Sequence, residues 1–506
     1  MFKQSLNFNR IGKALPIILI TLAALWLRVT NLGYSDYQGD EIKALVQPIP
    51  GQSWVEFILA QKKGPVQFLV TSLIYRVNSS FENEFLTRLP FALAGVLAVL
   101  VFYVTLKLLT DRRIALYAAL FFAINGLFVG LTRIVQYQSF VLLFSCLAVY
   151  FFALALYQPR WWLAGIYLGM LSWALAILTH YDGAMILPFV AYLLLRWLKD
   201  HRHMPLKSWL GYIVLPAVLA VLVLGGFYLA LFGRSSDISQ AYWLSRITGI
   251  EDNASLIQSS LANFKLYNPV FALPIYVALA ILSFFQIKRV FPYWLWFAFP
   301  FVVMEFIIFD PGTHIYTYLL PATVILAFGL QTLEKWLVKL YNQRLGTISG
   351  VALGTIVFGL LFTISHFIFV DHTPEYPWQS RRFLVWKIER PSDQYKLWVY
   401  GFPYYRHWEE IGETSANTPP ETNYASNENP SITTYYVDRP FDKQNPDVYI
   451  NIINPQSFRV RTANDKIRYW TNNYPPEKTF LNNGQVVAEI YVMPPGSLDE
   501  IKAKGY

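Results

Sequence analysis

The sequence is poor in charged residues and in cysteine. Asp, Glu, Lys and Arg make up 14% of the 506 residues, whereas they approach about a quarter of an average soluble chain. The single cysteine, Cys146, lies in an apolar run and has no partner in its own chain. The sequence also lacks a glycine-rich phosphate loop, metal-binding Cys/His spacing, a Gly-x-Ser-x-Gly elbow and internal repeats. Disulfide bonds therefore supply no stability, and the chemistry depends on other residues.

Apolar residues dominate instead. The sequence is 55% hydrophobic and 17% aromatic, which indicates an integral membrane protein, because Trp and Tyr favour the two bilayer interfaces. A helix needs roughly 20 mostly apolar residues to cross the hydrocarbon core, and this rule predicts about eleven transmembrane helices. The predicted spans are 12–31, 89–109, 114–131, 139–157, 161–179, 183–198, 209–231, 269–287, 291–309, 315–333 and 347–370.

Basic residues gather at alternate span ends. They are Lys107, Arg112, Arg113, Arg160, Arg196, Lys199, Arg202, Lys207, Lys288, Arg289, Lys335, Lys339 and Arg344. Because Lys and Arg mark the cytoplasmic side, the pattern predicts a multi-pass protein of the plasma (inner) membrane with a cytoplasmic N-terminus. The net charge of +9 then needs no nucleic-acid partner. The first outer loop, 32–88, and the C-terminal segment face the outside.

The composition changes after residue 370. Apolar runs shorten, and "YKLWVYG", "DVYINII" and "QVVAEIYVMP" predict strands between the probable helical segments "YYRHWEEIGE" and "DKIRYWTNNY". The stretch "ETSANTPPETNYASNENPS" predicts a loop. We therefore expect a membrane domain at 1–370 and a small extracytoplasmic α/β domain at 371–506.

Ionisable residues lie close to the outer span ends. They are Asp40, Glu41, Lys62, Lys63, Arg88, Arg133, His180, Asp182, Asp310 and His314. A charged group at membrane depth costs about 2.5 to 3.5 kcal/mol on insertion scales, so such groups usually pair or face a wet cavity with a function. The alternative for each residue is a loop charge that only meets water. Amphipathic stretches on both sides of "KKGP" predict helices that lie on the membrane surface.

Several of these residues fall in short motifs that follow one another in a fixed order. The motifs are "GDE" with Asp40 and Glu41, "KKGP" with Lys62 and Lys63, "RLP" at Arg88, "TRIVQYQSFVLLFSCLAVY" with Arg133 and Tyr137, and "THY" at His180. In this order and spacing, residues 1–330 resemble the GT-C superfamily of polyprenyl-phosphate-sugar-dependent glycosyltransferases, which includes protein mannosyltransferases and aminoarabinose transferases. Thr317 stands where relatives often carry the arginine of "RYLLP", and Gly64 interrupts the lysine-proline element. No "WWDxG" occurs, which argues against an oligosaccharyltransferase.

The resemblance implies a GT-C membrane fold and a single-sugar transfer. The donor would be a sugar on a polyprenyl phosphate, within membrane lipids, and the acceptor a lipid, glycan or protein on the exoplasmic side. Asp40 would be the general base, with Glu41 orienting it or the acceptor, and Lys62 or Lys63 with Arg133 would bind the donor phosphate. The further substrate-binding candidates, for which packing is the alternative role, are Arg88, Tyr137, His180, Asp182 and His314.

One base without a covalent nucleophile implies inversion at the anomeric carbon. No organic cofactor is implied, and the sequence leaves open whether a divalent metal takes part. Two other functions fit similar residues: a flippase or transporter for a lipid-linked glycan, and a ligase that transfers a preassembled glycan. Transporters usually carry structural repeats and discontinuous helices near the midplane, whereas the ionisable residues here lie at one face.

Overall fold

The computed structural model of the chain has two compact units. It describes residues 8–61, 63–234, 244, 256–269, 271–309, 311–378, 380–389, 400–456 and 464–493. The first unit, here called the bundle, comprises Met1–Thr30, Gln47–Leu73 and Leu89–His366. The second, here called the α/β unit, comprises Asn31–Val46, Ile74–Arg88 and Phe367–Tyr506. The predicted domain boundary at residue 370 stays a prediction.

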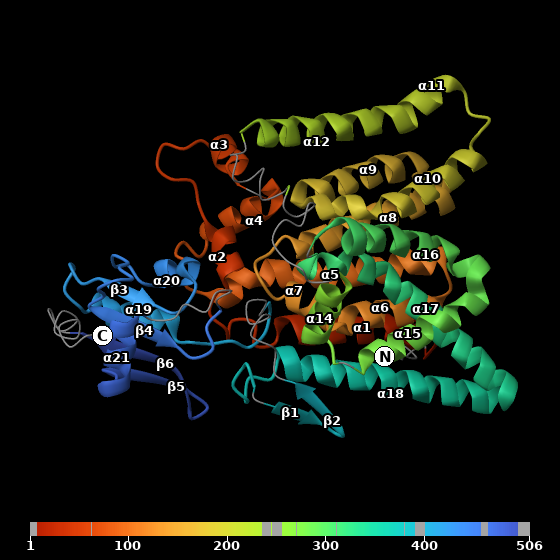
Figure 1. Cartoon of the computed structure of the whole chain (residues 1–506). Coiled ribbons are helices and arrows are strands. Elements are labelled where there is room, and N and C mark those ends of the chain that lie inside the picture. The colour runs from red at the N-terminus through yellow and green to blue at the C-terminus, as the bar shows by residue number, and fades with distance from the viewer. Residues whose placement is uncertain are drawn as a thin grey trace, which may run out of the picture. The chain divides into compact units, whose positions relative to one another are not determined.

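Long apolar helices make up the bundle, and many of them run in similar directions (Figure 1). The α-helices are α1 (Phe8–Val29), α3 (Trp54–Leu59), α4 (Pro65–Tyr75), α5 (Glu84–Leu109), α6 (Arg112–Ile124), α7 (Gly126–Leu131), α8 (Gln138–Tyr157), α9 (Trp162–Thr179), α10 (Leu187–Asp200), α11 (Leu206–Trp209), α12 (Leu215–Arg234), α14 (Leu256–Tyr267), α15 (Ala272–Ser283), α16 (Ile287–Val302), α17 (Tyr316–Leu340) and α18 (Gln343–Phe369). Short 3-10 or π segments are η1 (Pro159–Trp161), η2 (Tyr181–Ile186), η3 (Leu210–Val214), η4 (Phe284–Gln286), η5 (Val303–Ile307) and η6 (Gly312–Ile315).

The predicted class, a helical multi-pass membrane protein, is confirmed, but the count of eleven spans is not. Within the described residues, 8 helical stretches are long and apolar enough to cross a membrane. The predicted span 114–131 is divided at Asn125, whose extended backbone ends α6 and whose side chain caps α7 through Leu127 N at 3.1 Å. The predicted spans 269–287 and 291–309 are counted within one continuous helical stretch, Ala272–Ile307. The chain nevertheless reverses at η4, where Trp294 Nε1 donates to Ser283 Oγ at 3.2 Å, so α16 runs back from the end of α15.

Burial differs sharply along the bundle. In the stretch that contains α17, 89% of the apolar window is buried, against 6% in the stretch that contains α12. Helix α17 lies among other helices, and α12 lies at an edge (Figure 1). A Cβ atom at Gly329 would lie 1.9 Å from the Leu279 carbonyl oxygen, so this glycine allows α15 and α17 to pack backbone against backbone.

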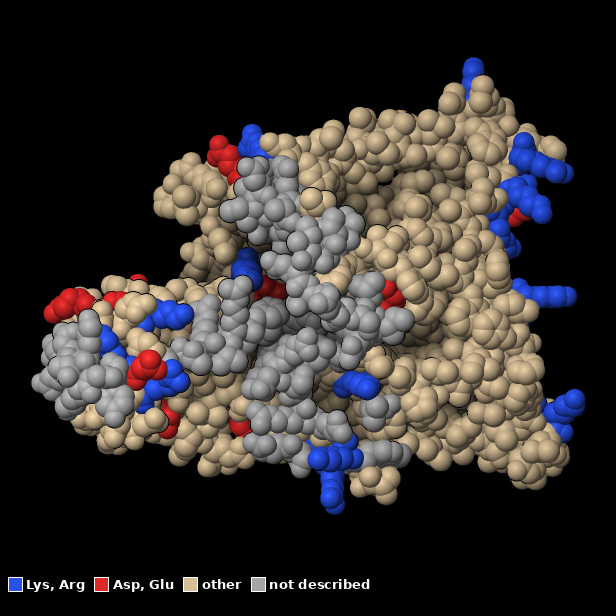
Figure 2. All heavy atoms as spheres, viewed as in Figure 1, with Lys and Arg blue, Asp and Glu red and all other residues tan. Residues whose placement is uncertain are grey.

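Basic side chains gather at one end of the bundle. In Figure 2 they lie along the edge that holds the loops between α10 and α11 and between α17 and α18. The remaining surface of the bundle in that view is mostly uncharged. This distribution agrees with the alternating basic loops of the sequence.

The α/β unit contains a mixed sheet. Its elements are α2 (Gly39–Leu45), β1 (Ser380–Phe383), β2 (Trp386–Glu389), α19 (Trp408–Ala416), β3 (Tyr424–Ser426), α20 (Pro430–Tyr436), β4 (Val448–Ile452), α21 (Asp465–Asn473), β5 (Lys478–Asn482) and β6 (Gln485–Val492). Four strands pair in the order β3-β4-β6-β5, with β3 and β4 parallel and the other pairs antiparallel. Strands β1 and β2 form a separate antiparallel pair.

The predicted C-terminal α/β domain is confirmed. Strands β4 and β6 and helices α19 and α21 lie in segments where the sequence predicts them, and Ile467 of α21 packs with Tyr449 and Tyr491 of the sheet. Of the predicted strand at 395–401, residues 395–399 lie outside the described residues. The predicted loop at 413–431 is partly wrong, because it contains the end of α19 and the short strand β3. Strand β3 forms by pairing with β4 and has little local signal.

Candidate functional site

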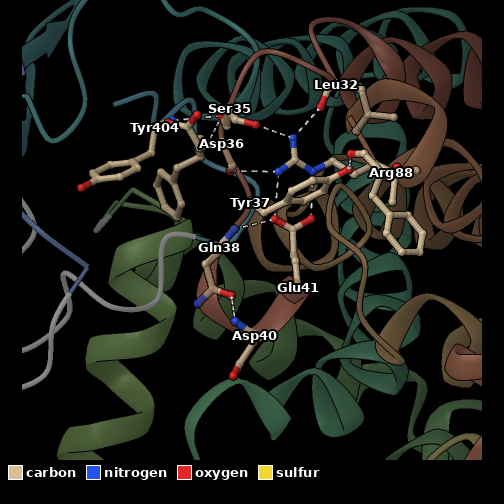
Figure 3. Close-up of polar contacts among 12 residues, drawn as sticks. Leu32, Ser35, Asp36, Tyr37, Gln38, Asp40, Glu41, Arg88 and Tyr404 are labelled. Atoms are coloured by element: carbon tan, nitrogen blue, oxygen red, sulfur yellow. Dashed lines mark hydrogen bonds and ion pairs between the residues drawn. The ribbon is translucent and has the colours of Figure 1, made fainter. Parts of the chain in front are cut away.

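Helix α2 presents the two acidic residues of the first outer loop. Gln38 caps the helix: its Oε1 accepts from the Asp40 backbone N–H at 2.7 Å. In return, Glu41 Oε2 accepts from the Gln38 backbone N–H at 2.9 Å, which completes a capping box. The segment "QGDE" therefore folds as a short, fixed helical turn (Figure 3).

Glu41 is buried in a complete ion pair with Arg88. The Arg88 Nε donates to Glu41 Oε1 at 2.8 Å, and Nη2 donates to Oε2 at 2.9 Å. The remaining guanidinium N–H groups donate to the carbonyl oxygens of Leu32, Ser35 and Asp36 at 3.1, 2.8 and 3.0 Å (Figure 3). An arginine has five N–H donors, so Arg88 uses all of them on the loop that carries α2.

Asp40 has different surroundings, although it is the neighbour of Glu41. Its side chain is 33% exposed, whereas that of Glu41 is 1% exposed. Asp40 Oδ2 accepts from the hydroxyl of Tyr400 at 2.7 Å, and Oδ1 accepts from Lys43 at 2.9 Å. The capped turn thus holds one carboxylate inside the unit and one at its surface.

Sequence analysis missed Asp36, a third carboxylate of this loop. It is buried, and its two oxygens accept backbone N–H groups from Arg406 and Trp408. Burial raises the pKa of the Asp36 carboxyl to about 6. Its partners lie about 370 residues away in the sequence, so no local pattern could have identified this contact.

In the bundle, the lysine-proline element lies against the end of α9. Lys63 Nζ donates to Gln136 Oε1 at 2.9 Å and lies 5.0 Å from the ring centre of Tyr137. Gly64 permits this position, because a Cβ atom there would lie 1.7 Å from the Leu178 carbonyl oxygen. The glycine that departs from the family pattern therefore has a packing reason in this chain. Lys62 lies outside the described residues.

Asp182 is the centre of a polar cluster in the same unit. Its Oδ2 lies 2.7 Å from His314 Nδ1 and accepts from the Tyr316 hydroxyl at 2.8 Å. Its Oδ1 lies 3.2 Å from His180 Nδ1. The ring of Tyr137 stacks on His180, with ring centres 3.9 Å apart and planes 9° apart. Sequence analysis missed Tyr316, which precedes Thr317 in the "HIYTYLLPA" segment.

The predicted site residues thus separate into two groups. The bundle brings together Lys63, Tyr137, His180, Asp182 and His314, and the α/β unit holds Asp40, Glu41 and Arg88. Arg133 is buried in the bundle, where its Nη1 donates to the carbonyl oxygens of Leu27 and Thr30 at 2.8 and 2.9 Å. Among the described residues, the group that could hold a metal ion is His180, Asp182 and His314.

One family model matches the sequence. Residues 62–225 match the family described as dolichyl-phosphate-mannose-protein mannosyltransferase. The matched segment includes Lys63, Arg133 and Asp182. Asp40 and His314 lie outside it. No curated protein matches the chain.

Two proteins of known structure share the fold. The chain is similar to ArnT from Cupriavidus metallidurans in the apo state, with a TM-score of 0.52 and 11% identity over 95% of this chain and 98% of that one. The structure of the same ArnT bound to undecaprenyl phosphate gives a TM-score of 0.51, 12% identity and coverage of 95% and 99%. The oligosaccharyltransferase of Archaeoglobus fulgidus in the apo form gives a TM-score of 0.50 and 13% identity, with 82% of this chain aligned.

The chain spans 59% of the length of the archaeal enzyme, against 98% of the apo ArnT chain. Together with the family-model match, these similarities confirm the resemblance to the GT-C superfamily of polyprenyl-phosphate-dependent glycosyltransferases.

Proposed function

We propose that this protein is an inverting membrane glycosyltransferase that moves a single sugar from a polyprenyl-phosphate donor to an acceptor on the exoplasmic side. The observation that carries the proposal is the fold similarity to ArnT along 95% of the chain. That ArnT was solved with undecaprenyl phosphate bound. The mannosyltransferase family match over residues 62–225 supports the same class of donor.

The leaving group of this reaction is a phosphate anion. When the bond between the anomeric carbon and the phosphate oxygen breaks, negative charge builds on that oxygen, and a nearby cation stabilises it. We assign this role to Lys63 and Arg133 of the bundle. Lys63 supports the assignment because its ammonium is held near its partner Gln136 by the turn at Gly64.

The acceptor hydroxyl must lose its proton as its oxygen attacks the anomeric carbon. We assign the base to Asp40, because its carboxylate is partly exposed and fixed by Tyr400 and Lys43. Each oxygen of an ionised carboxylate has two lone pairs, so each can accept a further hydrogen bond. Glu41 and Arg88 are positioning residues in this proposal, since their buried pair fixes the turn.

The same proposal puts the N-terminus in the cytoplasm and the α/β unit outside the membrane. The basic side chains at one end of the bundle support this orientation (Figure 2). A tag inserted after Arg202 or Gly346 should resist external protease in intact cells, while a tag fused after Tyr506 should be cleaved. Cleavage of the first two tags and protection of the third would reverse the orientation and place Asp40 on the wrong side.

The donor class is tested with purified protein in lipid nanodiscs. We would incubate the protein with a panel of polyprenyl-phosphate monosaccharides and follow the release of polyprenyl phosphate by mass spectrometry. Consumption of one donor, with a product of opposite anomeric configuration by NMR, is the expected result. If no monosaccharide donor is consumed and polyprenyl phosphate does not bind, the proposal is wrong.

A ligase for preassembled glycans is the second candidate, because the fold also resembles the archaeal oligosaccharyltransferase. The same panel should therefore include a polyprenyl-pyrophosphate oligosaccharide. Exclusive use of that donor would favour the ligase. Movement of a labelled donor between the leaflets of a vesicle, without its consumption, would instead favour a flippase.

A further inference from the structure

The cluster around Asp182 combines two imidazoles and one carboxylate. One ligand atom from each of His180, Asp182 and His314 lies within 4.8 Å of the others. These three residues come from two parts of the chain: His180 caps η2 and Asp182 lies in its first turn, whereas His314 lies in η6. Two nitrogen ligands with one carboxylate oxygen are a set that transition metals accept in proteins.

Two potential metal ligands, a ring nitrogen and a carboxylate oxygen, face each other in this cluster. His180 Nδ1 lies 3.3 Å from the Asp182 backbone nitrogen, in position to accept its N–H. The same nitrogen lies 3.2 Å from Asp182 Oδ1. Among the described residues, Oδ1 is a buried oxygen that accepts no hydrogen bond. A buried anionic oxygen without a donor is costly, and a cation bound by both atoms would remove that cost.

The remaining contacts of Asp182 orient its carboxylate. Tyr316 donates its hydroxyl to Oδ2 at 2.8 Å, and the side chain of Asp182 is fully buried. Protein sites commonly fix a metal-binding carboxylate through such an outer hydrogen bond. Gly183 also holds the turn close to α9, because a Cβ atom there would lie 2.4 Å from the Ala176 carbonyl carbon. The position of Asp182 is thus set by packing as well as by charge.

We propose that His180, Asp182 and His314 bind a divalent transition-metal ion, with zinc as the best fit. Zinc binds nitrogen and oxygen ligands at about 2.0 to 2.2 Å in tetrahedral geometry, which separates two ligand atoms by about 3.3 to 3.5 Å. The 3.2 Å between His180 Nδ1 and Asp182 Oδ1 is close to this value. Magnesium and calcium fit less well, because they favour oxygen ligands.

Three protein ligands leave a fourth position on a tetrahedral ion. The side chain of His314 is 13% exposed, whereas that of Asp182 is fully buried, so the cluster opens on the His314 side. Water or a phosphate oxygen can occupy such a position. This metal site rests on the cluster itself and does not depend on the transferase activity.

The test is the metal content of the full-length chain. The protein should be purified through a tag without histidine, equilibrated with zinc and freed of excess ion by dialysis. We expect about one equivalent of zinc per chain, with near-complete loss in Asp182→Asn and His314→Gln. His203→Gln is the matched control, because His203 is an exposed histidine outside the cluster, and it should keep the metal.

The cobalt-substituted wild-type protein gives a second readout that needs no variant. Tetrahedral cobalt with imidazole ligands should produce strong visible absorption bands, and they should shift when inorganic phosphate or polyprenyl phosphate fills the fourth position. The proposal fails if the wild type binds no ion, or if both cluster variants bind as much as His203→Gln. Because no sugar donor is present, this failure is distinct from failure of the proposed glycosyl transfer.

Discussion

The two units each bury a carboxylate almost completely, but they neutralise it in different ways. In the α/β unit, Glu41 is paired with Arg88, whose guanidinium is permanently charged and donates twice to it. In the bundle, Asp182 is surrounded by His180, His314 and the hydroxyl of Tyr316. An imidazole can exchange its proton for a metal ion, whereas a guanidinium cannot.

This difference indicates different roles for two equally buried acids. In the Glu41 pair, all N–H groups of Arg88 already have partners. The pair therefore stabilises the conformation of the loop. Among the residues that the structure describes, none donates a hydrogen bond to the buried Asp182 Oδ1, so this oxygen can still bind a cation. Burial of a charge alone therefore does not identify a binding site, and the completeness of its hydrogen bonds does.

The largest expected effect is the loss of transfer rate in Asp40→Asn. Asp40→Asn keeps the shape of the side chain but cannot accept the acceptor proton, and removal of a general base commonly costs 10²- to 10⁴-fold in rate. That loss corresponds to about 3 to 5 kcal/mol in the barrier. We expect donor binding to persist, because the variant loses no cation. Single-turnover transfer and equilibrium donor binding, measured side by side, test this prediction.

Asp465→Asn is the matched control for Asp40→Asn. Asp465 pairs with an arginine three residues away, and its side chain is 75% exposed, so its loss should leave transfer unchanged. If Asp40→Asn retains transfer within about tenfold of the wild type, the base lies elsewhere. Equal losses of transfer and donor binding would instead give Asp40 a binding or structural role.

Arg88→Ala should break the buried ion pair between Arg88 and Glu41 in the α/β unit. Removing one partner of a buried ion pair leaves the other charge uncompensated and commonly costs about 3 to 5 kcal/mol of stability. We expect a large drop in the unfolding temperature, which can be measured by intrinsic tryptophan fluorescence of the protein in detergent. Arg468→Ala, which removes an exposed arginine of the same unit, should change it little.

A double variant sharpens this test. Arg88→Met with Glu41→Gln removes both charges, so much of the loss seen in Arg88→Ala should be recovered. Equal stability of Arg88→Ala and Arg468→Ala would show that the pair contributes little. Better transfer by the double variant than by Arg88→Ala would support a positioning role for the pair.

The sequence predicted much of the fold and part of the site. Long apolar runs report helices directly, so most spans were found, but the break at Asn125 depends on one side chain that caps the next helix. Asp40 and Glu41 looked equivalent as neighbours, and only the distant partner Arg88 separates them. The link between Asp36 and Arg406 joins residues far apart in the chain. Such pairings arise from tertiary packing and leave no local pattern.

Lys63→Gln tests the bundle side of the comparison. A hydrogen bond to a charged group contributes about 1.5 to 3 kcal/mol, and each 1.4 kcal/mol is about tenfold in affinity. We therefore expect donor affinity to fall by about tenfold to a hundredfold, with a smaller effect on the stability of the folded protein. Lys339→Gln, an exposed lysine at the end of α17, is the control. Unchanged donor affinity in Lys63→Gln would remove this lysine from the phosphate site.

Gly64→Ala should give the smallest change in stability and donor affinity. The direction of the stability change tests the packing of this glycine. The added methyl group would lie 1.7 Å from the Leu178 carbonyl oxygen, so the turn that carries Lys63 must move away from α9. Such overpacking typically costs about 1 to 3 kcal/mol, and the same movement should weaken donor binding. Thermal unfolding and donor affinity measure the two effects separately.

Gly211→Ala is the opposite case. Within the described part of the chain, no heavy atom lies within 4 Å of a Cβ at Gly211, and this glycine is in a helical segment, η3. Replacing a helical glycine by alanine stabilises by roughly 0.5 to 1 kcal/mol, so the unfolding temperature should stay the same or rise. If Gly64→Ala behaves like Gly211→Ala, the turn has room to spare, and the packing of Gly64 against α9 does not fix the position of Lys63. If only Gly64→Ala loses stability and donor affinity together, backbone packing positions the cation of the bundle, as the buried Arg88 pair positions Asp40 in the α/β unit.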